Sequence, residues 1–282
     1  MKKTIVLFFL SIVMSAQLAL AQISTPAPSP LATVSQVVGL TKVEVVYSRP
    51  AMRGRTIMGE LVPYGQLWRT GANQATKISF DEPMSIAGTT LPAGSYAIFS
   101  IPEQGRWTVI FNKNTQQGGT AQYKQEEDAL RIEVTPMDAG MGFEDFTVLF
   151  SDLSATSANL NLLWENTRVS FPITDPDVDE KVMTQIQTEI PKAGDNDNVY
   201  FAAASYYFAN NKDMKQAAEW VDKAVSLNEE KYWVLHLQAK IHAALNNNEK
   251  AATAARKSME LAKKNNNPDY VKLNEALIAT LD

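Results

Sequence analysis

The sequence predicts a chain of mixed class with two domains, an antiparallel β-sandwich or barrel followed by an α-helical array. Three observations carry this prediction. Residues 35–174 contain eight or nine short segments rich in aromatic and β-branched residues, separated by turn residues. From residue 175 the hydrophobic pattern changes to the period of an amphipathic helix. Residues 198–264 then repeat themselves with a period of 34 residues.

The first 21 residues have the features of an export signal. Lys2 and Lys3 precede an apolar run, and the small residues Ala19 and Ala21 form an A-x-A cleavage pattern. The apolar run is shorter than the roughly 18 residues that are needed to cross a bilayer. We therefore expect cleavage near Ala21 and a soluble periplasmic or secreted protein without a membrane span.

The β-domain is expected from about Ser35 to Thr174, after a linker rich in proline and serine at residues 22–34. Its strand candidates are rich in aromatic and β-branched residues, and they are residues 42–48, 75–81, 95–102, 106–112, 129–136, 143–153, 158–165 and 168–173. Because no long helix is expected between them, these strands predict an antiparallel sandwich or barrel.

The helical domain is expected at residues 175–282. Asp175 is suited to cap its first helix, and Pro176 suits a first helical position. Apolar residues then recur every four positions, at Val178, Val182, Ile186 and Ile190.

The next residues resemble tetratricopeptide repeats. Small or apolar residues recur 34 positions apart, as Ala217, Val221, Ala224 and Leu227 and then Ala251, Ala255, Ser258 and Leu261. Two copies cover residues 198–264, and residues 268–281 are expected to form a capping helix. Such repeats imply either a protein or peptide partner or an intramolecular brace for the β-domain.

Composition excludes several kinds of chemistry. A net charge of −5 argues against a nucleic-acid partner. The absence of cysteine excludes disulfides, thiolate metal sites and a cysteine nucleophile. The two histidines, His236 and His242, both fall late in the chain, so the β-domain has no histidine to activate a serine. We expect neither a metal nor a cofactor.

Positive charge gathers in the first third of the β-domain. Between Thr41 and Phe80, six basic residues face two acidic ones, a net charge of +4 in a chain of −5. Because the planar arginine side chain suits carboxylate and phosphate, this segment predicts an anion-binding pocket. The predicted ligand-binding residues are Arg49, Arg53, Arg55, Trp68, Arg69 and Asn73. The alternative is that the arginines pair with carboxylates and hold loops in place; the candidates are Glu60, Asp81 and Glu82.

The segment "YGQLWRTGAN" (residues 64–73) combines turn residues with two of the site candidates. Gly65, Gly71 and Asn73 are expected to take positive φ in turns. Trp68 is expected to pack inward, whereas Arg69 needs a partner that packing and turn chemistry do not supply. The tryptophans Trp68, Trp107 and Trp164 are expected in the core, with a sugar-stacking platform as the alternative.

A family resemblance covers the β-domain. The stretch "YSRPAMRGRTIMGELVPYGQLWRTGANQATKISF", with "LPAGSYAIFSIP" and "WTVIFNK" behind it, resembles the bacterial exported family called domain of unknown function 2911. The resemblance runs from about Val34 to Ile173. It implies an extracytoplasmic β-domain, often followed by helical repeats, and it implies no established reaction and no catalytic residues.

Two functions follow from these patterns. The first is a non-enzymatic binding or assembly module that holds an anionic or polar envelope ligand, such as a glycan, a peptide carboxylate or a phosphate, at the arginines. The alternative is a carboxylate-dependent glycan hydrolase in which Glu60 or Asp81 is the acid or base. Hydrolysis would require two carboxyl groups roughly 5 to 9.5 Å apart in one cleft.

Overall fold

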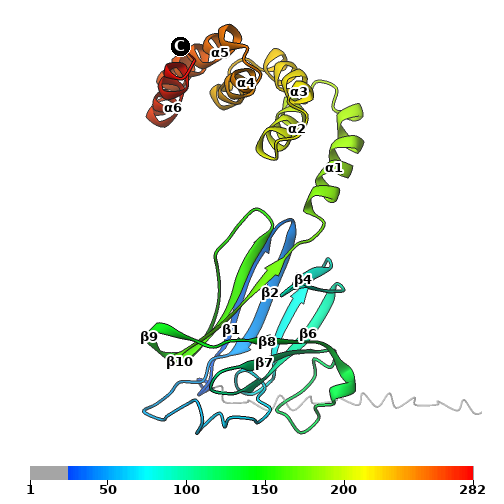
Figure 1. The fold of residues 1–282 in the computed structure, drawn as a ribbon, viewed down its shortest axis with the longest axis vertical. Coiled ribbons are helices and arrows are strands. Elements are labelled where there is room, and N and C mark those ends of the chain that lie inside the picture. Colours follow the sequence, from blue (N-terminus) through cyan, green and yellow to red (C-terminus); the bar gives the residue numbers. More distant parts are fainter. Residues whose placement is uncertain (1–24, 282) are drawn as a thin grey trace, which may run out of the picture. The chain divides into compact units, whose positions relative to one another are not determined.

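The computed structural model describes residues 25–281, and the chain divides into two compact units, one up to Pro176 and one from Asp177. The predicted export signal, with its cleavage near Ala21, lies outside the described residues. Within residues 25–281, none of the helices combines the length and the apolar character that crossing a membrane requires. The β unit comes first and the helical unit second (Figure 1), which confirms the predicted fold class.

The strands of the β unit form two antiparallel sheets. The first has the order β1 (Leu31–Val38), β2 (Thr41–Ser48), β3 (Thr76–Phe80), β6 (Gly94–Pro102), β7 (Trp107–Asn112) and β8 (Asp128–Val134). The second has the order β5 (Thr89–Leu91), β4 (Met84–Ile86), β10 (Ser157–Thr174) and β9 (Met137–Ser151). A short 3-10 helix, η1 (Gln125–Glu127), precedes β8. The sheets do not close into a barrel, so the sandwich is the architecture that the chain adopts.

One hydrophobic core lies between the two sheets. Alternate residues of β2, such as Val43 and Val45, are fully buried, because successive side chains of a strand point to opposite faces. From the second sheet, Phe146 of β9 and Phe171 of β10 enter the same cluster. Full burial of one such side chain contributes about 1.5–3 kcal/mol, so this shared core holds the sandwich together.

Strand β1 begins at Leu31, inside the segment for which the sequence predicts a linker. It pairs with β2 from Leu31 opposite Ser48 to Val38 opposite Thr41, through a two-residue turn with Gly39 at φ 63°. As the edge strand of its sheet, it buries only Val38 fully. Because its other residues are half-buried or exposed, they need not be strongly apolar, and the hydrophobic pattern does not mark the strand.

Asp175 does not cap the first helix, and this prediction is wrong. Its carboxylate accepts hydrogen bonds from the Leu40 amide at 3.1 Å and from the Thr41 hydroxyl at 3.0 Å. It therefore fastens the β1–β2 turn to the end of β10. The first helix starts at Val178 with Asp177 at the N-cap position, so Pro176 precedes the helix.

The second unit is helical throughout. Its elements are α1 (Val178–Glu189), η2 (Ile190–Lys192), α2 (Asp197–Ala209), α3 (Met214–Leu227), α4 (Tyr232–Ala244), α5 (Asn248–Lys264) and α6 (Pro268–Ala279). Each helix from α2 to α5 packs against the next one along the chain. Residues 34 positions apart share their environment: Ala217 of α3 and Ala251 of α5 are both fully buried, and so are Val221 and Ala255.

Both histidines belong to polar networks of this unit. His242 of α4 is buried and its Nε2 lies 2.9 Å from Asp222 Oδ1. The Nδ1 of His236 lies 2.9 Å from Oδ1 of the buried Asn274, and burial lowers the pKa of His236. The second network ties α6 to α4.

Candidate functional site

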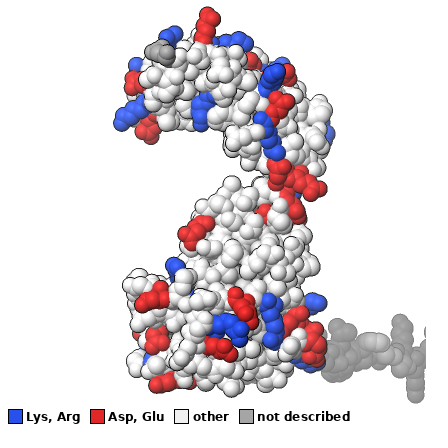
Figure 2. Space-filling model, viewed as in Figure 1, with Lys and Arg blue, Asp and Glu red and all other residues white. Residues whose placement is uncertain are grey.

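All six predicted site residues lie on one connection, residues 49–75 between β2 and β3. This connection is anchored to the strands that it crosses. The Met52 amide donates to the Glu144 carbonyl at 2.8 Å, and Trp68 and Ser100 exchange two backbone hydrogen bonds of 2.8 Å. On the face of the β unit in Figure 2, charged side chains gather toward the end where this connection runs in Figure 1.

The predicted turn residues of this connection take positive φ, as expected. Gly65 has φ 73°, Gly71 has φ 148° and Asn73 has φ 57°, and Thr70 also lies in this region at φ 53°. A Cβ at Gly71 would lie 3.0 Å from the Thr76 hydroxyl oxygen, so the close approach of two chain segments requires glycine here. The Arg69–Thr70 pair therefore lies between turns whose residues take positive φ.

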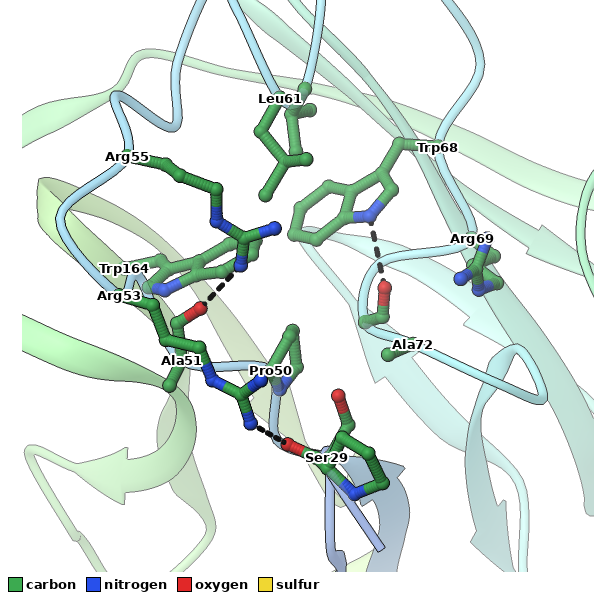
Figure 3. A pocket seen from close by; sticks show the side chains of 13 residues that line it. Ser29, Pro50, Ala51, Arg53, Arg55, Leu61, Trp68, Arg69, Ala72 and Trp164 are labelled. Carbon is green, nitrogen blue, oxygen red and sulfur yellow. Dashed lines mark hydrogen bonds between the residues drawn. The ribbon is translucent and has the colours of Figure 1, made fainter.

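A cavity of about 450 Å³ lies beside this connection (Figure 3). Its lining includes Arg53, Arg55, Trp68 and Arg69, which are four of the six predicted residues. The other lining residues are Pro28, Ser29, Pro50, Ala51, Leu61, Val62, Gly71, Ala72 and Trp164. Among the described residues that line it, none is an aspartate or a glutamate.

Arg53 and Arg55 are exposed and use only part of their hydrogen-bonding capacity. The Nη2 of Arg53 donates to the Pro28 carbonyl at 2.9 Å. Arg55 donates from Nε to the Met52 carbonyl at 2.8 Å and from Nη2 to the Ala51 carbonyl at 2.7 Å. These neutral partners orient the guanidinium groups and leave further N–H donors available. The Arg53 amide donates to Glu144 Oε1 at 2.8 Å, so one carboxylate lies beside Arg53, but within residues 25–281 neither guanidinium forms an ion pair.

Arg69 is half-buried, and its Nε is buried without a hydrogen-bond partner. Within the described part of the chain, its guanidinium forms neither a hydrogen bond nor an ion pair. Leaving a buried polar group unsatisfied costs about 1–3 kcal/mol. Residues 25–281 therefore supply no hydrogen-bond or ion-pair partner for the Arg69 guanidinium, and the side chain lies beside the cavity.

Two predicted site residues do not line the cavity. Arg49 donates from Nε to the Phe146 carbonyl at 3.1 Å and from Nη2 to the Thr147 hydroxyl at 2.8 Å. Asn73 donates to the Ser29 carbonyl at 3.2 Å. Both side chains therefore brace the chain around the cavity, because their polar atoms are used by neighbouring segments.

An aromatic cluster forms one side of the cavity. The Trp68 ring stacks on Trp164 with centroids 5.8 Å apart, and it meets Trp107 and Phe146 edge-on at 6.1 and 5.3 Å. Trp107 and Trp164 are buried, in agreement with the expected core position, whereas Trp68 is half-buried. Trp68 and Trp164 line the cavity, although Trp164 is almost wholly covered.

The comparison with protein families decides the identity of the β unit. The family described as protein of unknown function (DUF2911) matches residues 29–173, about half of the chain. The chain belongs to the DUF2911 family. All the lining residues of the cavity except Pro28 fall inside the matched residues, so the cavity is part of the DUF2911 domain. The comparison with curated proteins found no match.

The carboxylates named for hydrolysis lie elsewhere in the DUF2911 domain. Glu60 is exposed on a turn, and Asp81 borders a separate hollow of about 330 Å³ beside Lys42 and Glu44. Neither residue lines the arginine cavity. Among residues 25–281, Glu60 and Asp81 form no ion pair with an arginine of the predicted site. These two candidate partners therefore do not neutralise Arg49, Arg53, Arg55 or Arg69. No group of three His, Asp or Glu side chains in this part of the chain is arranged to hold a metal.

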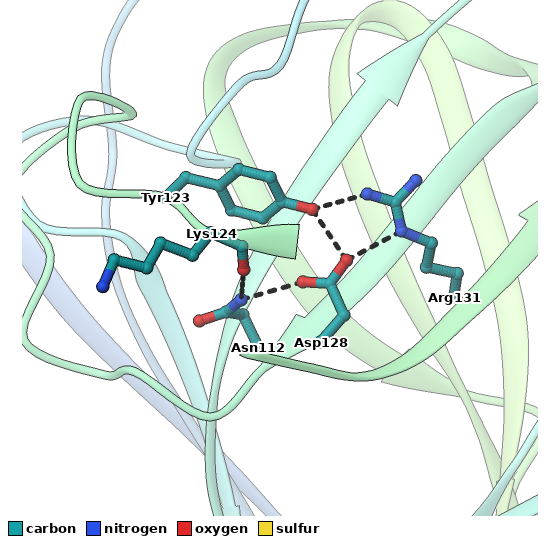
Figure 4. Close-up of polar contacts among 5 residues, drawn as sticks. All are labelled: Asn112, Tyr123, Lys124, Asp128 and Arg131. Atoms are coloured by element: carbon teal, nitrogen blue, oxygen red, sulfur yellow. Dashed lines mark hydrogen bonds and ion pairs between the residues drawn. The ribbon is translucent and has the colours of Figure 1, made fainter. Parts of the chain in front are cut away.

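A second polar cluster of the DUF2911 domain has its partners within the chain (Figure 4). Asp128 accepts from Tyr123 Oη, from Arg131 Nε and from Asn112 Nδ2, at 2.7, 2.7 and 2.8 Å. Burial, followed by the hydrogen bond to Asp128, raises the pKa of Tyr123 to about 12, so the phenol remains a donor at neutral pH. Because Asp128 finds its donors inside the protein, this cluster holds the β7–β8 connection in place.

Sequence reasoning missed the cavity wall formed by Pro28 and Ser29. Their segment accepts hydrogen bonds through main-chain carbonyls: Pro28 from Arg53, Ser29 from Asn73 and Pro30 from the Arg49 amide at 2.9 Å. Every residue has such a carbonyl, so no side-chain pattern marks the contact. Trp164 was recognisable from the sequence as a candidate, because it is one of the tryptophans considered for a sugar-stacking platform.

Proposed function

We propose that the DUF2911 domain of this chain is an exported, non-enzymatic binding module whose arginine cavity holds a small anionic ligand. One observation carries the proposal: three guanidinium groups line one cavity of about 450 Å³, and none of its described lining residues is acidic. Charge of one sign that is concentrated in a concave site attracts ligands of the opposite charge.

The hydrogen-bonding state of the arginines supports this proposal. Arg53 and Arg55 are oriented by backbone carbonyls, so they are positioned before a ligand arrives. A carboxylate or phosphate accepts two parallel N–H bonds from one guanidinium, and such charge-assisted bonds are about twice as strong as neutral ones. The Arg69 guanidinium has no hydrogen bond or ion pair within residues 25–281, so its unburied N–H groups are available to an incoming oxyanion.

Binding is favoured over glycan hydrolysis by the position of the carboxylates. A glycosidase needs two carboxyl groups on either side of one sugar bond. Glu60 and Asp81, the candidates for this role, do not line the arginine cavity. The site therefore offers positive charge and aromatic surface but no acid–base pair drawn from these residues.

We extend the proposal to the rest of the chain. The basic and apolar N-terminal residues with Ala19 and Ala21 support export and cleavage. The helical unit acts as a short tetratricopeptide-like array, supported by the 34-residue spacing of the buried Ala217 and Ala251. Its role is to hold a protein partner or to brace the chain.

Calorimetric titration of the purified chain tests the anion site. The ligands are inorganic phosphate, sulfate, glucuronate and glucose 6-phosphate at low and moderate salt. We expect at least one of them to bind wild type and to bind Arg69→Gln at least tenfold more weakly. Arg256→Gln, a change of equal charge at an exposed position of α5, serves as the matched control and should bind like wild type. Binding that is equal in all three proteins, or absent in all three, would contradict the proposal.

A further inference from the structure

The volume of the arginine cavity exceeds what a bare oxyanion fills. At roughly 30 Å³ per water molecule, 450 Å³ corresponds to on the order of 15 waters. Phosphate or sulfate occupies only a fraction of that space. Cavities of about 300–1,000 Å³ are typical of sites for small organic molecules. The dimensions thus fit an anion that carries an organic body.

The lining has an apolar part beside the charged one. Pro50, Val62 and Ala72 join Leu61 and the rings of Trp68 and Trp164. Leu61 is 43% exposed and is the most open of these apolar side chains, so a ligand in the cavity can cover it. Covering apolar surface yields about 25 cal/mol per Å². An inorganic anion cannot supply that gain, because it has no apolar surface.

The arrangement of the two parts suggests how such a ligand lies. Figure 3 shows Arg53 and Arg55 on one side of the cavity and Arg69 on the other, with Leu61 and Trp68 along the edge between them. A body that rests on Trp68 and Leu61 therefore has cationic groups on both sides. A sugar ring suits this setting, because it combines a C–H face that packs on an aromatic ring with hydroxyl groups at its rim.

From these observations we infer that the ligand is an organic anion of about the size of one sugar ring, namely a sugar acid or a sugar phosphate. Its carboxylate or phosphate binds the arginines, and one face of its ring covers Trp68 and Leu61. This inference rests on the anion-binding function proposed above. It adds that the apolar lining of the cavity contacts the ligand together with the arginines.

The test compares four probes by isothermal titration calorimetry: glucuronate, glucose 6-phosphate, neutral glucose and inorganic phosphate. At least one of the two sugar anions should bind tenfold or more tightly than both glucose and phosphate. The stronger of the two identifies the anionic group as carboxylate or phosphate. Arg69→Gln should weaken sugar anions and phosphate alike.

Leu61→Ser isolates the apolar contribution. Because Leu61 is exposed on a loop, its replacement should leave the fold intact, which the thermal midpoint checks. We expect this variant to bind the sugar anion several-fold more weakly and to bind inorganic phosphate as wild type does. Leu153→Ser, at another exposed leucine that does not line the cavity, is the matched control and should bind both probes normally.

The failures are distinguishable. Phosphate binding as tightly as the sugar anions, or an unchanged affinity of Leu61→Ser, would overturn the ligand class and leave the anion site in place. Glucose binding as tightly as the sugar anions would show that charge is not recognised. If no probe binds in a manner that depends on Arg69, the proposed function itself fails.

Discussion

Replacing Arg69 with methionine should stabilise the protein while it weakens anion binding. Methionine keeps the length and apolar character of the arginine stem and removes the guanidinium. Within residues 25–281 that group has no hydrogen bond or ion pair to lose, and its Nε is buried without a partner. The substitution therefore removes an uncompensated cost from the folded state.

The magnitude follows from the burial of this side chain. An unsatisfied buried polar group costs about 1–3 kcal/mol. Because Arg69 is only half-buried, the lower end applies, and we expect a gain of about 1 kcal/mol in the free energy of unfolding. In a domain of this size, that gain corresponds to a rise in Tm of roughly 2–4 °C.

Urea unfolding followed by tryptophan fluorescence measures this change. Three of the five tryptophans, Trp68, Trp107 and Trp164, lie in the DUF2911 domain, while Trp220 and Trp233 lie in the helical unit, whose unfolding circular dichroism at 222 nm follows. Arg256→Met, an exposed site in α5, should change the stability by less than about 0.5 kcal/mol. Anion titration of Arg69→Met should show the same loss of affinity as the glutamine variant.

The opposite outcome would refute this reasoning. If Arg69→Met lowers the free energy of unfolding by more than about 1 kcal/mol, the guanidinium stabilises the folded chain. Arg69 would then be a structural residue, and its unsatisfied Nε would carry no information about a ligand.

Three further predictions concern other residues. Gly71→Ala should destabilise the protein by about 1–3 kcal/mol in urea unfolding, since the new Cβ would meet the Thr76 hydroxyl oxygen at 3.0 Å with φ at 148°. Tyr123→Phe should cost about 1 kcal/mol at pH 7, because a donor to a buried carboxylate is lost. Folding raises the pKa of Tyr123 from 10.0 to about 12. The stabilisation that comes from this raised pKa is therefore fully present below pH 10, and it is lost as the pH rises through about 12. Ala217→Leu and Ala251→Leu should each destabilise the helical unit by about 1–3 kcal/mol, measured at 222 nm, because both sites are fully buried.

Matched variants give the controls for these changes. A Cβ at Gly105 meets no atom within 4 Å, so Gly105→Ala should be nearly neutral, and an equal effect at Gly71 would contradict the crowding argument. A stability difference between Tyr123→Phe and wild type that is independent of pH from 9 to 12 would oppose the raised pKa. If only one of the two alanine variants is destabilised, their positions are not equivalent.

The arginine cavity was predictable in part because its charged residues share one segment. Arg53, Arg55 and Arg69 stood out through local charge segregation, and a short loop segment limits how far apart they can lie. Which of them face the cavity depends on backbone turns, so Arg49 and Asn73 were indistinguishable from the others by sequence. The Arg49 side chain donates a hydrogen bond to the Thr147 hydroxyl, and the Asn73 side chain donates one to the Ser29 carbonyl. Both contacts form only in the folded chain.

The fold was readable where burial leaves a strong pattern. Central strands such as β2 and β7 are rich in buried apolar residues, and the sequence marks them clearly. The edge strand β1 and the contact of Asp175 with Thr41 left no such mark. Asp175 lies 134 residues away from Thr41 along the chain, so its local setting before a helix suggested a cap.

The wall formed by Pro28 and Ser29 has a practical consequence for measuring this site. The chain contains no cysteine, so Ser29→Cys would introduce the single thiol of the protein at the edge of the cavity. The main-chain carbonyl of residue 29, which receives the Asn73 hydrogen bond, is kept by that substitution. With an environment-sensitive dye on this thiol, a change in fluorescence emission would report directly whether a ligand occupies the cavity.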